Sequence, residues 1–277
     1  MLSERFARQR AAEPLLPEID EFETHLPADG HVATRGGEVV AYLGGEVDEE
    51  HQMARWLFPG HAAREPEALR DLFALQAAEL GVSRFMLTVP ANDPELIDVW
   101  FQLAFGCQAI WAVREVEPRD PAATIRPATP DDVEELVDFE EILYAHQGSS
   151  PSFSGFTMPP REEVRKEFDE VWEDDSYIPF VASDGERLVG MLALYRRPEG
   201  DLRVPANNID LAFAATRTDV RGSGIGLALT DFALNWAYEN GFGSMTVDWR
   251  SVNLLSSRFW TNRGFRPQYL RLYRAVP

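Results

Sequence analysis

Six consecutive residues, Arg221-Gly222-Ser223-Gly224-Ile225-Gly226, combine a flexible backbone with one positive side chain. They stand between a β-rich run that ends at Thr216 and a helical pattern that continues to about Asn240. The first N–H groups of a helix have no intrahelical partner and point outward together. A side chain at position 222, 224 or 226 would hold a phosphate away from those amides. The segment therefore fits a diphosphate-binding turn, and a glycine-rich connector without a ligand is the alternative.

The pattern around this turn predicts the elements that position it. In the second half we expect helices at 130–144, 161–172, 224–240 and 254–263, and strands at 124–127, 178–183, 187–196, 209–216, 244–249 and 268–275. Asp184-Gly185 predicts a two-residue hairpin turn. In the long helix, one buried stripe is expected from Ile225, Leu229, Phe232 and Trp236. Mostly antiparallel strands with helices on both faces make the fold class α+β.

An internal repeat at an offset of 160 residues indicates two related domains in tandem. Residues 79–81 fall on 239–241, 85–89 fall on 245–249, and Phe105 falls on Phe265. Each copy reads as a helix, a glycine stop, a strand, a second helix and a last strand. Pro118 and Pro121 interrupt the pattern, so we place the boundary near residue 120, giving domains 1–120 and 121–277. The first copy has a hairpin at 31–35 and 39–45, and we expect no opening strand or helices before it.

A second motif follows the strand after the glycine turn: residues 253–265 read NLLSSRFWTNRGF. With the turn, it resembles the GNAT acyltransferase superfamily, in which R-x-x-G-x-G opens a helix and N-x-x-[AS]-x-x-[FL]-[YW]-x-x-x-G-F follows the next strand. The resemblance covers residues 124–277 well and 31–117 weakly. It implies a tandem GNAT protein with two GNAT-like domains, each a mixed, mostly antiparallel sheet flanked by helices. The N-terminal copy is expected to be degenerate.

The resemblance also implies a binding site for acetyl-CoA as the acyl donor. The turn would hold the pyrophosphate, and the backbone of the preceding strand would pair with the pantetheine arm as with an added strand. Asn253 matches the family's asparagine near the cofactor, with helix capping as the alternative. The cofactor-binding residues expected are Ala214, Ala215, Thr216, Arg221, Gly222, Ser223, Gly224, Ile225, Gly226, Asn253 and Trp260.

Catalysis in that family would need a base, because an amine is mostly ammonium at pH 7. The family often places a carboxylate early on the strand before the turn, where Asp210 stands here, and Asp248 on the next strand is the second candidate. A solvated acid and an ion-pair partner for Arg250 are the respective alternatives. Trp260 replaces the usual tyrosine, and an indole is no useful proton donor. It is expected to pack in the core or stack on the cofactor, and water, Tyr269 or Tyr273 would supply any proton.

The first copy does not keep the glycines. At the offset of 160, Arg221, Gly222, Gly224 and Gly226 correspond to His61, Ala62, Arg64 and Pro66. Proline has no N–H to offer, and the other side chains would obstruct a phosphate. We therefore expect residues 1–120 to bind no CoA and to have a structural role.

Charge and composition exclude several classes of protein. A net charge of -20 repels nucleic acids and anionic membranes and favours a cationic or neutral acceptor. One cysteine allows no internal disulfide, and the five histidines lack helical metal-site spacing, so no metal is expected. Without a signal-like or membrane-length apolar run, the chain is expected in the cytoplasm. Residues 147–160, rich in Ser, Gly and Pro, predict either a disordered loop or a mobile lid.

The sequence thus predicts an N-acetyltransferase that moves an acetyl group from acetyl-CoA to a small-molecule or peptide amine by direct attack. No Ser-His or Cys-His arrangement suggests a covalent intermediate. The alternative is a catalytically inactive CoA-binding sensor or scaffold. The acceptor and the oligomeric state are not specified by the sequence.

Overall fold

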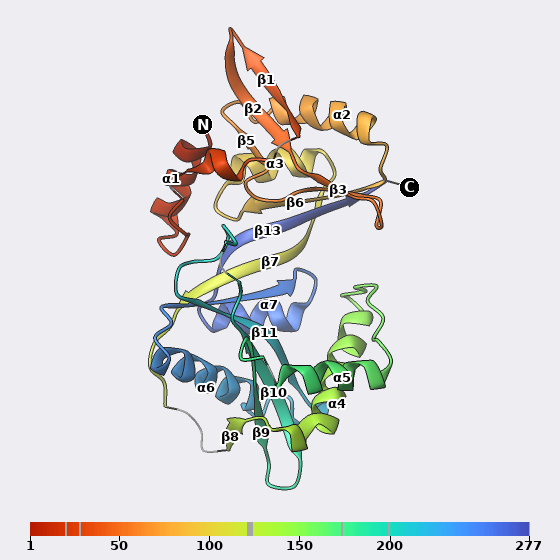
Figure 1. Cartoon of the computed structure of the whole chain (residues 1–277), viewed down its shortest axis with the longest axis vertical. Coiled ribbons are helices and arrows are strands. Elements are labelled where there is room, and N and C mark those ends of the chain that lie inside the picture. Colours follow the sequence, from red (N-terminus) through yellow and green to blue (C-terminus); the bar gives the residue numbers. More distant parts are fainter. Residues whose placement is uncertain (20, 28, 121–123, 173, 199, 277) are drawn as a thin grey trace. The chain divides into compact units, whose positions relative to one another are not determined.

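The computed structural model describes residues 1–19, 21–27, 29–120, 124–172, 174–198 and 200–276 (Figure 1). The chain forms two compact units. The first comprises Met1–Ala112, Leu202–Pro205 and Arg266–Pro277, and the second comprises Val113–Asp201 and Ala206–Phe265. Residues 121–123, at the boundary expected near residue 120, lie outside the described part, and the division into 1–120 and 121–277 stays a prediction. No helix of the described residues is long and apolar enough to cross a membrane.

The second unit is a sheet covered on both faces by helices. Its strands run in the order β12-β11-β10-β9-β8, with β11 parallel to β12 and the pairs β11–β10, β10–β9 and β9–β8 antiparallel. In Figure 1, α4 and α5 lie on one side of β9–β11 and α6 lies on the other. The elements are β8 (Ile125–Pro127), α4 (Val133–Gly148), α5 (Arg161–Val171), β9 (Tyr177–Ser183), β10 (Leu188–Tyr195), β11 (Asn208–Thr216), α6 (Ile225–Glu239), β12 (Ser244–Arg250) and α7 (Leu254–Asn262).

Short 3-10 helices precede two of these helices: η2 (Pro130–Asp132) leads into α4, and η3 (Thr218–Val220) lies in the turn before α6. The predicted elements of this half are confirmed to within a few residues, and so is the α+β class. The hairpin predicted at Asp184-Gly185 is present, but its connection is four residues long, 184–187, with Gly185 at a φ of 100°.

The predicted buried stripe of α6 is only partly right. Leu229 is buried, whereas Ile225, Phe232 and Trp236 are half-buried. The fully buried positions are Leu229, Thr230, Ala233, Leu234 and Ala237. Small residues at 233 and 237 bring the helix close to the sheet, so the large aromatic side chains lie beside the contact instead of beneath it.

The first unit is built from the same kinds of element. They are α1 (Leu2–Ala12), η1 (Phe22–His25), β1 (Gly30–Arg35), β2 (Glu38–Gly44), β3 (Glu46–Asp48), β4 (Met53–Trp56), β5 (His61–Ala63), α2 (Ala68–Leu80), β6 (Arg84–Pro90), α3 (Pro94–Gln102), β7 (Gly106–Glu115) and β13 (Arg266–Ala275). The hairpin, both later helices and the strand between them are confirmed. The expectation that no helix precedes the hairpin was wrong, because α1 does.

Two sheets make up the first unit. One has the order β1-β2-β5, and the other contains β3-β4-β6-β13 followed by β7. The sequence analysis counted the last strand with the second half, but β13 pairs antiparallel with β6. Phe85, Leu87 and Val89 of β6 are buried, so β6 is a central strand that needs a neighbour at each edge, and β4 and β13 fill those places.

Candidate active site

The glycine turn has an open surface and a backbone that only glycine adopts readily. Gly222 and Gly224 have φ values of 85° and 93°, and a Cβ added to either would meet nothing within 4 Å. Residues 221–224 are exposed. Gly222 and Gly224 are thus required first by backbone conformation, which L side chains rarely adopt. Gly226 differs, because a Cβ there would touch the ring of Phe259 at an ordinary 3.5 Å.

Hydrogen bonds within the turn, and close packing of α6 on the sheet, hold the turn in place. The backbone N–H and hydroxyl of Ser223 both donate to the carbonyl of Val220, at 3.2 and 2.7 Å. A Cβ on Gly190 of β10 would lie 2.8 Å from Leu229 and 2.9 Å from Ile225. Gly190 therefore allows the first turns of α6 to pack directly on the sheet. The sequence analysis did not single out this glycine; its place in an otherwise apolar strand was the signal for a close approach.

β11 separates from β12 halfway along its length. In the described residues their parallel pairing ends at Leu211 and Val247. At the same place β11 carries a bulge against β10: Leu194 pairs with Leu211 and Ala193 with Phe213, leaving Ala212 as the extra residue. The register with β10 then continues to Thr216. On the side that faces β12, the backbone groups of Ala214, Ala215 and Thr216 thus lie outside the pairing between β11 and β12.

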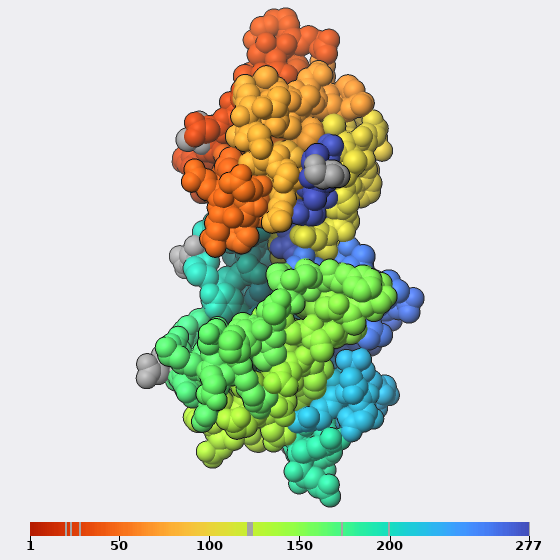
Figure 2. Space-filling view, turned by 90° about the vertical axis from the view of Figure 1, so that its right-hand side faces the viewer, coloured from red at the N-terminus to blue at the C-terminus, as the bar shows by residue number. Residues whose placement is uncertain are grey.

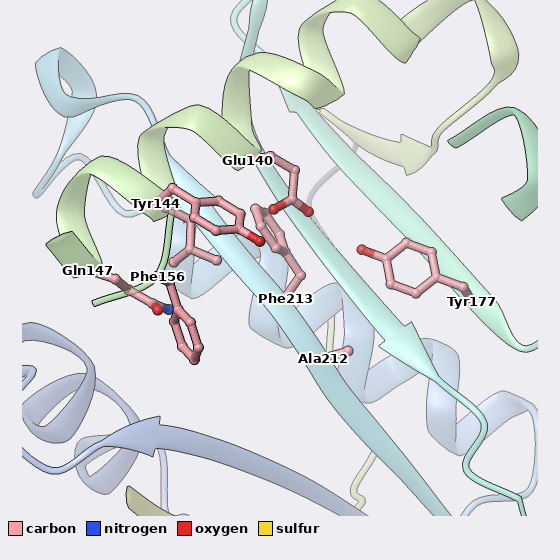
Figure 3. Close-up of a pocket in the computed structure, with 8 residues that line it drawn as sticks. Glu140, Tyr144, Gln147, Phe156, Tyr177, Ala212 and Phe213 are labelled. Carbon is pink, nitrogen blue, oxygen red and sulfur yellow. The ribbon is translucent and has the colours of Figure 1, made fainter. Parts of the chain in front are cut away.

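A cavity of about 320 Å³ adjoins this separation. It is lined by Glu140, Leu143, Tyr144, Gln147, Phe156, Tyr177, Ala212 and Phe213, from α4, the coil after it, β9 and β11 (Figure 3). The bulge residue Ala212 is part of its wall, so the cavity reaches the strand edge just described. Figure 2 shows the residues of α4, the following coil and α5, in green, together over one face of this unit.

Glu140 is the charged side chain of this lining, and sequence reasoning missed it. Figure 3 shows its carboxylate and the hydroxyls of Tyr144 and Tyr177 directed toward the same part of the cavity. Burial, with a smaller contribution from Glu167, raises the pKa of Glu140 to about 7. Burial and the same carboxylates raise the pKa of Tyr144, and burial with Glu140 raises that of Tyr177. Glu140 and Tyr144 are four residues apart on α4, a spacing that puts them on one helix face.

The two carboxylates predicted from the strands have other surroundings. Asp210 is 5% exposed; it accepts a hydrogen bond from Arg197 at 2.8 Å and one from the hydroxyl of Thr246 at 2.7 Å. Both of its oxygens are therefore engaged, one in an ion pair with Arg197 and the other in a hydrogen bond with Thr246. Burial alone would lower the pKa of Arg197, but the nearby Asp210, Asp201 and Asp248 together outweigh that effect and raise it. Asp248 is exposed and interacts electrostatically with Arg197 and Arg250.

Asn253 and Trp260 occupy structural positions in α7. The Asn253 side chain caps the helix by accepting from the N–H of Ser256 at 3.2 Å, and it also lies 3.2 Å from Nε2 of His146. Trp260 is buried, with its ring against those of Phe259 and Phe265. Capping and core packing are thus observed for these two residues, and contact of either with a cofactor stays a prediction. Tyr269 and Tyr273 lie in β13, which belongs to the first unit.

The coil between α4 and α5 contributes an exposed aromatic side chain to the cavity. Phe156 is 54% exposed and lines the cavity, and the guanidinium of Arg250 lies 4.7 Å from its ring centroid. Phe153 is 70% exposed. The lid predicted at 147–160 therefore has two side chains at the cavity, Gln147 and Phe156, while opening and closing stay a prediction. The described residues contain no group of three or more His, Cys, Asp or Glu that could hold a metal ion.

The first unit has no equivalent turn, but for a reason different from the one predicted. The offset of 160 matched Arg221 and Gly222 with His61 and Ala62, yet these two residues lie in β5 and pair with Leu43 and Tyr42. They are strand residues and were wrongly matched with a loop. One constant offset fails here because the connection between strand and helix differs in length between the copies.

Comparison with known proteins agrees with this description. Residues 142–265 match the family model "Acetyltransferase (GNAT) family". No curated protein matches the chain in sequence. A GCN5-related N-acetyltransferase from Sphaerobacter thermophilus is 14% identical with a TM-score of 0.57, over 86% of this chain and 78% of its own. A functionally unknown conserved protein from Staphylococcus epidermidis is 11% identical with a TM-score of 0.51, over 94% and 99%.

A tandem GNAT protein from the clavulanic acid biosynthesis pathway is 12% identical with a TM-score of 0.51, and it covers all of this chain and 95% of its own. At such identities these likenesses show the fold, and they support two GNAT-like domains. The family match lies where the turn, the separated strands and the cavity lie. The chain thus contains a domain, at residues 142–265, that matches the GNAT acetyltransferase family.

Proposed function

We propose that the second unit transfers an acetyl group from acetyl-CoA to an amine. The observation that carries this proposal is the continuity of three features: an exposed amide turn, a strand edge at 214–216 and a cavity that begins at Ala212. An acyl donor held by the turn and by the strand edge would place its acyl group at the cavity. Family membership supports acyl transfer in general, and this arrangement supports the donor and the acceptor.

The turn suits a diphosphate because residues 221–224 are exposed and lead into the N-terminus of α6, where the positive end of the helix dipole attracts an anion. Arg221 is exposed at the start of the turn and adds a positive charge. Ala214, Ala215 and Thr216 offer backbone groups to an extended amide-containing chain, as an edge strand does. When bound, acetyl-CoA supplies a thioester, and the protein's task is to bring a neutral amine to its carbonyl carbon.

Direct attack follows from the composition of the cavity, whose lining contains no Ser, Cys, Thr or His. A carboxylate takes one proton from the ammonium group, and the amine nitrogen then attacks the carbonyl carbon. The C–S bond breaks, the CoA thiolate leaves and receives a proton, and the net products are the amide, free CoA and one proton. Asp210 and Asp248 stay proposals for the base, and Asp210 is the less suited of the two because both its oxygens are engaged.

A catalytically inactive CoA-binding module is the second candidate. It is favoured by Trp260, which stands in the place of the family's usual tyrosine, is buried, and cannot serve as a proton donor. Turnover separates the two candidates: release of free thiol from acetyl-CoA in the presence of amines supports the enzyme, and binding without release across a broad amine panel supports the module.

Donor binding is tested with a matched pair of glycine variants. Gly224→Glu adds bulk and negative charge in the turn, and Gly241→Glu makes the same change at the other end of α6, where φ is 81° and the space is also open. Titration calorimetry should give one acetyl-CoA site per chain, lost in Gly224→Glu and kept in Gly241→Glu. Two sites per chain, or undiminished binding by Gly224→Glu, would contradict the proposal.

A further inference from the structure

The wall of the cavity restricts what can bind there. Four of its eight lining side chains are aromatic, Tyr144, Phe156, Tyr177 and Phe213, and Leu143 and Ala212 are apolar. A volume of about 320 Å³ is at the small end for ligand pockets, which span roughly 300–1,000 Å³. Such a cavity has room for one ring or branched alkyl group with a short chain. A ligand made of several rings would extend beyond it.

The charges around the cavity restrict the ligand further. Glu140 is the one charged residue of the lining, and in the described part of the chain it has no Arg, Lys or His as an ion-pair or hydrogen-bond partner. Glu167 of α5 acts electrostatically on Glu140, and Glu140 in turn acts on Tyr144 of α4 and Tyr177 of β9. Glu140 is half-buried, and removing a carboxylate from water without a cation is costly, so a ligand ammonium would reduce that cost. Aromatic faces add cation–π attraction for the same group.

Other charge patterns fit less well. A second ammonium on the ligand would lie against apolar wall without a carboxylate. A carboxylate or phosphate on the ligand would meet the negative potential of Glu140 and Glu167. The ligand that matches the wall therefore carries a single positive charge and an uncharged body.

We propose that this cavity binds a small monoamine with one compact aromatic or branched apolar body, and that Glu140 holds its ammonium group and takes its proton before attack on the thioester. This rests on the function proposed above. The proton passes from nitrogen to a Glu140 oxygen, which leaves the nitrogen lone pair free, and Glu140 returns the proton to solvent after each turnover. Asp210, bound to Arg197 and Thr246, then has a positioning role in the sheet below.

Ligand binding tests the proposal independently of turnover. With the full chain at pH 8, phenethylamine should bind at least 10-fold more tightly than 2-phenylethanol, which lacks the charge, than phenylalanine, which adds a carboxylate, and than spermidine, which adds ammonium groups. Glu140→Gln should weaken phenethylamine binding at least 10-fold and change 2-phenylethanol binding less than 2-fold.

Glu141→Gln is the matched control, because Glu141 is the next residue of α4 but is exposed and bonded to Arg161 at 2.7 Å. It should leave both ligands unaffected. Retained acetyl-CoA binding reports that each variant is folded. With phenethylamine as acceptor, Glu140→Gln should lower the rate of thiol release about 100- to 10,000-fold, the usual cost of losing a positioned base.

Several results would overturn the assignment. Equal binding of phenethylamine and 2-phenylethanol, preference for phenylalanine or spermidine, or equal effects of the Glu140 and Glu141 variants would each refute the monoamine site. Normal thiol release by Glu140→Gln with a strong loss in Asp210→Asn or Asp248→Asn would move the base to that strand residue. If the binding pattern holds but no amine releases thiol, the site is supported while the proton transfer and the proposed acetyl transfer fail.

Discussion

The connection from strand to helix is long in the second unit and short in the first. The N–H of Arg217 donates to the carbonyl of Val189, and the N–H of Arg64 donates to that of Val40, so both mark the same point beside a hairpin. From there seven residues, 218–224, lead to α6, but only three, 65–67, lead to α2. The first unit therefore lacks the whole turn. A fold can lose such a turn without losing its strands and helices, because the core contacts lie elsewhere.

The strand edge also differs between the units. In the second unit the bulge at Ala212 opens an edge at 214–216, whereas in the first unit the corresponding strand is broken into β4 and β5. The carbonyl of Ala63 in β5 accepts a hydrogen bond from Arg5 of α1 at 2.9 Å. Arg5 is held by Asp93, which caps α3 as Asn253 caps α7. The first unit thus covers with its own helix an edge that the second leaves open.

The largest expected effect comes from the buried pair that fixes α1. Arg5 and Asp93 side chains are each 6% exposed and lie 2.5 Å apart, so Arg5→Ala leaves an uncompensated buried carboxylate. We expect a loss of about 3–5 kcal/mol in the free energy of unfolding of the first unit, measured by denaturant titration. Arg64→Ala, which breaks only exposed pairs with Glu4 and Glu38, should cost about 1 kcal/mol or less.

Acetyl-CoA binding by Arg5→Ala sharpens the comparison. The stoichiometry should stay at one per chain, because uncovering the β5 edge does not restore the missing turn. A second acetyl-CoA site in this variant would mean that α1, and not the loss of the turn, prevents the first unit from binding acetyl-CoA.

Glu140 should give the next largest effect, one that depends on pH. Unlike Asp93, it is a half-buried carboxylate that has no cationic partner among the residues the structure describes, and its pKa of about 7 in the folded chain lies above its ordinary value of 4.5. Below pH 4.5 both states hold the proton and there is no cost. Between pH 4.5 and 7 the unfolded state loses the proton first, so stability falls as pH rises. Glu140→Gln should therefore be more stable than wild type by up to about 3 kcal/mol at pH 8 and equal at pH 4.

Thermal unfolding of both proteins across this pH range checks this expectation. A constant difference between them at every pH would show that the Glu140 carboxyl titrates normally. Glu141→Gln should show no such pH-dependent gain.

Asp210→Asn should have the smallest effect on stability, about 1–3 kcal/mol, because its partner Arg197 is 27% exposed and regains water. Acetyl-CoA affinity should hold in this variant. If Asp210 is the base, the transfer rate falls about 100- to 10,000-fold and recovers in part at high pH; if it positions the sheet, the rate follows the loss of folded protein. Rate and stability measured together on one sample distinguish the two.

The sequence predicted what local patterns determine. Periodicity and turn residues placed the helices and strands of the second half, and the glycine turn and Asn253 motif indicated the family. The cavity could not be predicted, because Glu140, Tyr177 and Ala212 come from three separate segments that only the folded sheet brings together. The Glu140-Tyr144 spacing was visible but is shared by many helix pairs. Asp210 was placed correctly on its strand, yet its partner Arg197 depends on register.

The bulge at Ala212 has a consequence for shape selection. An exposed edge strand can pair with a strand of another chain, and proteins normally cover or block such edges. Here one inserted residue creates an edge in the interior of a sheet, between β11 and β12, and its register with β10 limits it to the few residues before Thr216. Because α4 and α6 pack against the two faces of β11, large side chains on an entering chain would meet these helices. The separation next to Ala212 therefore favours a chain with amides along its length and small substituents over an ordinary polypeptide.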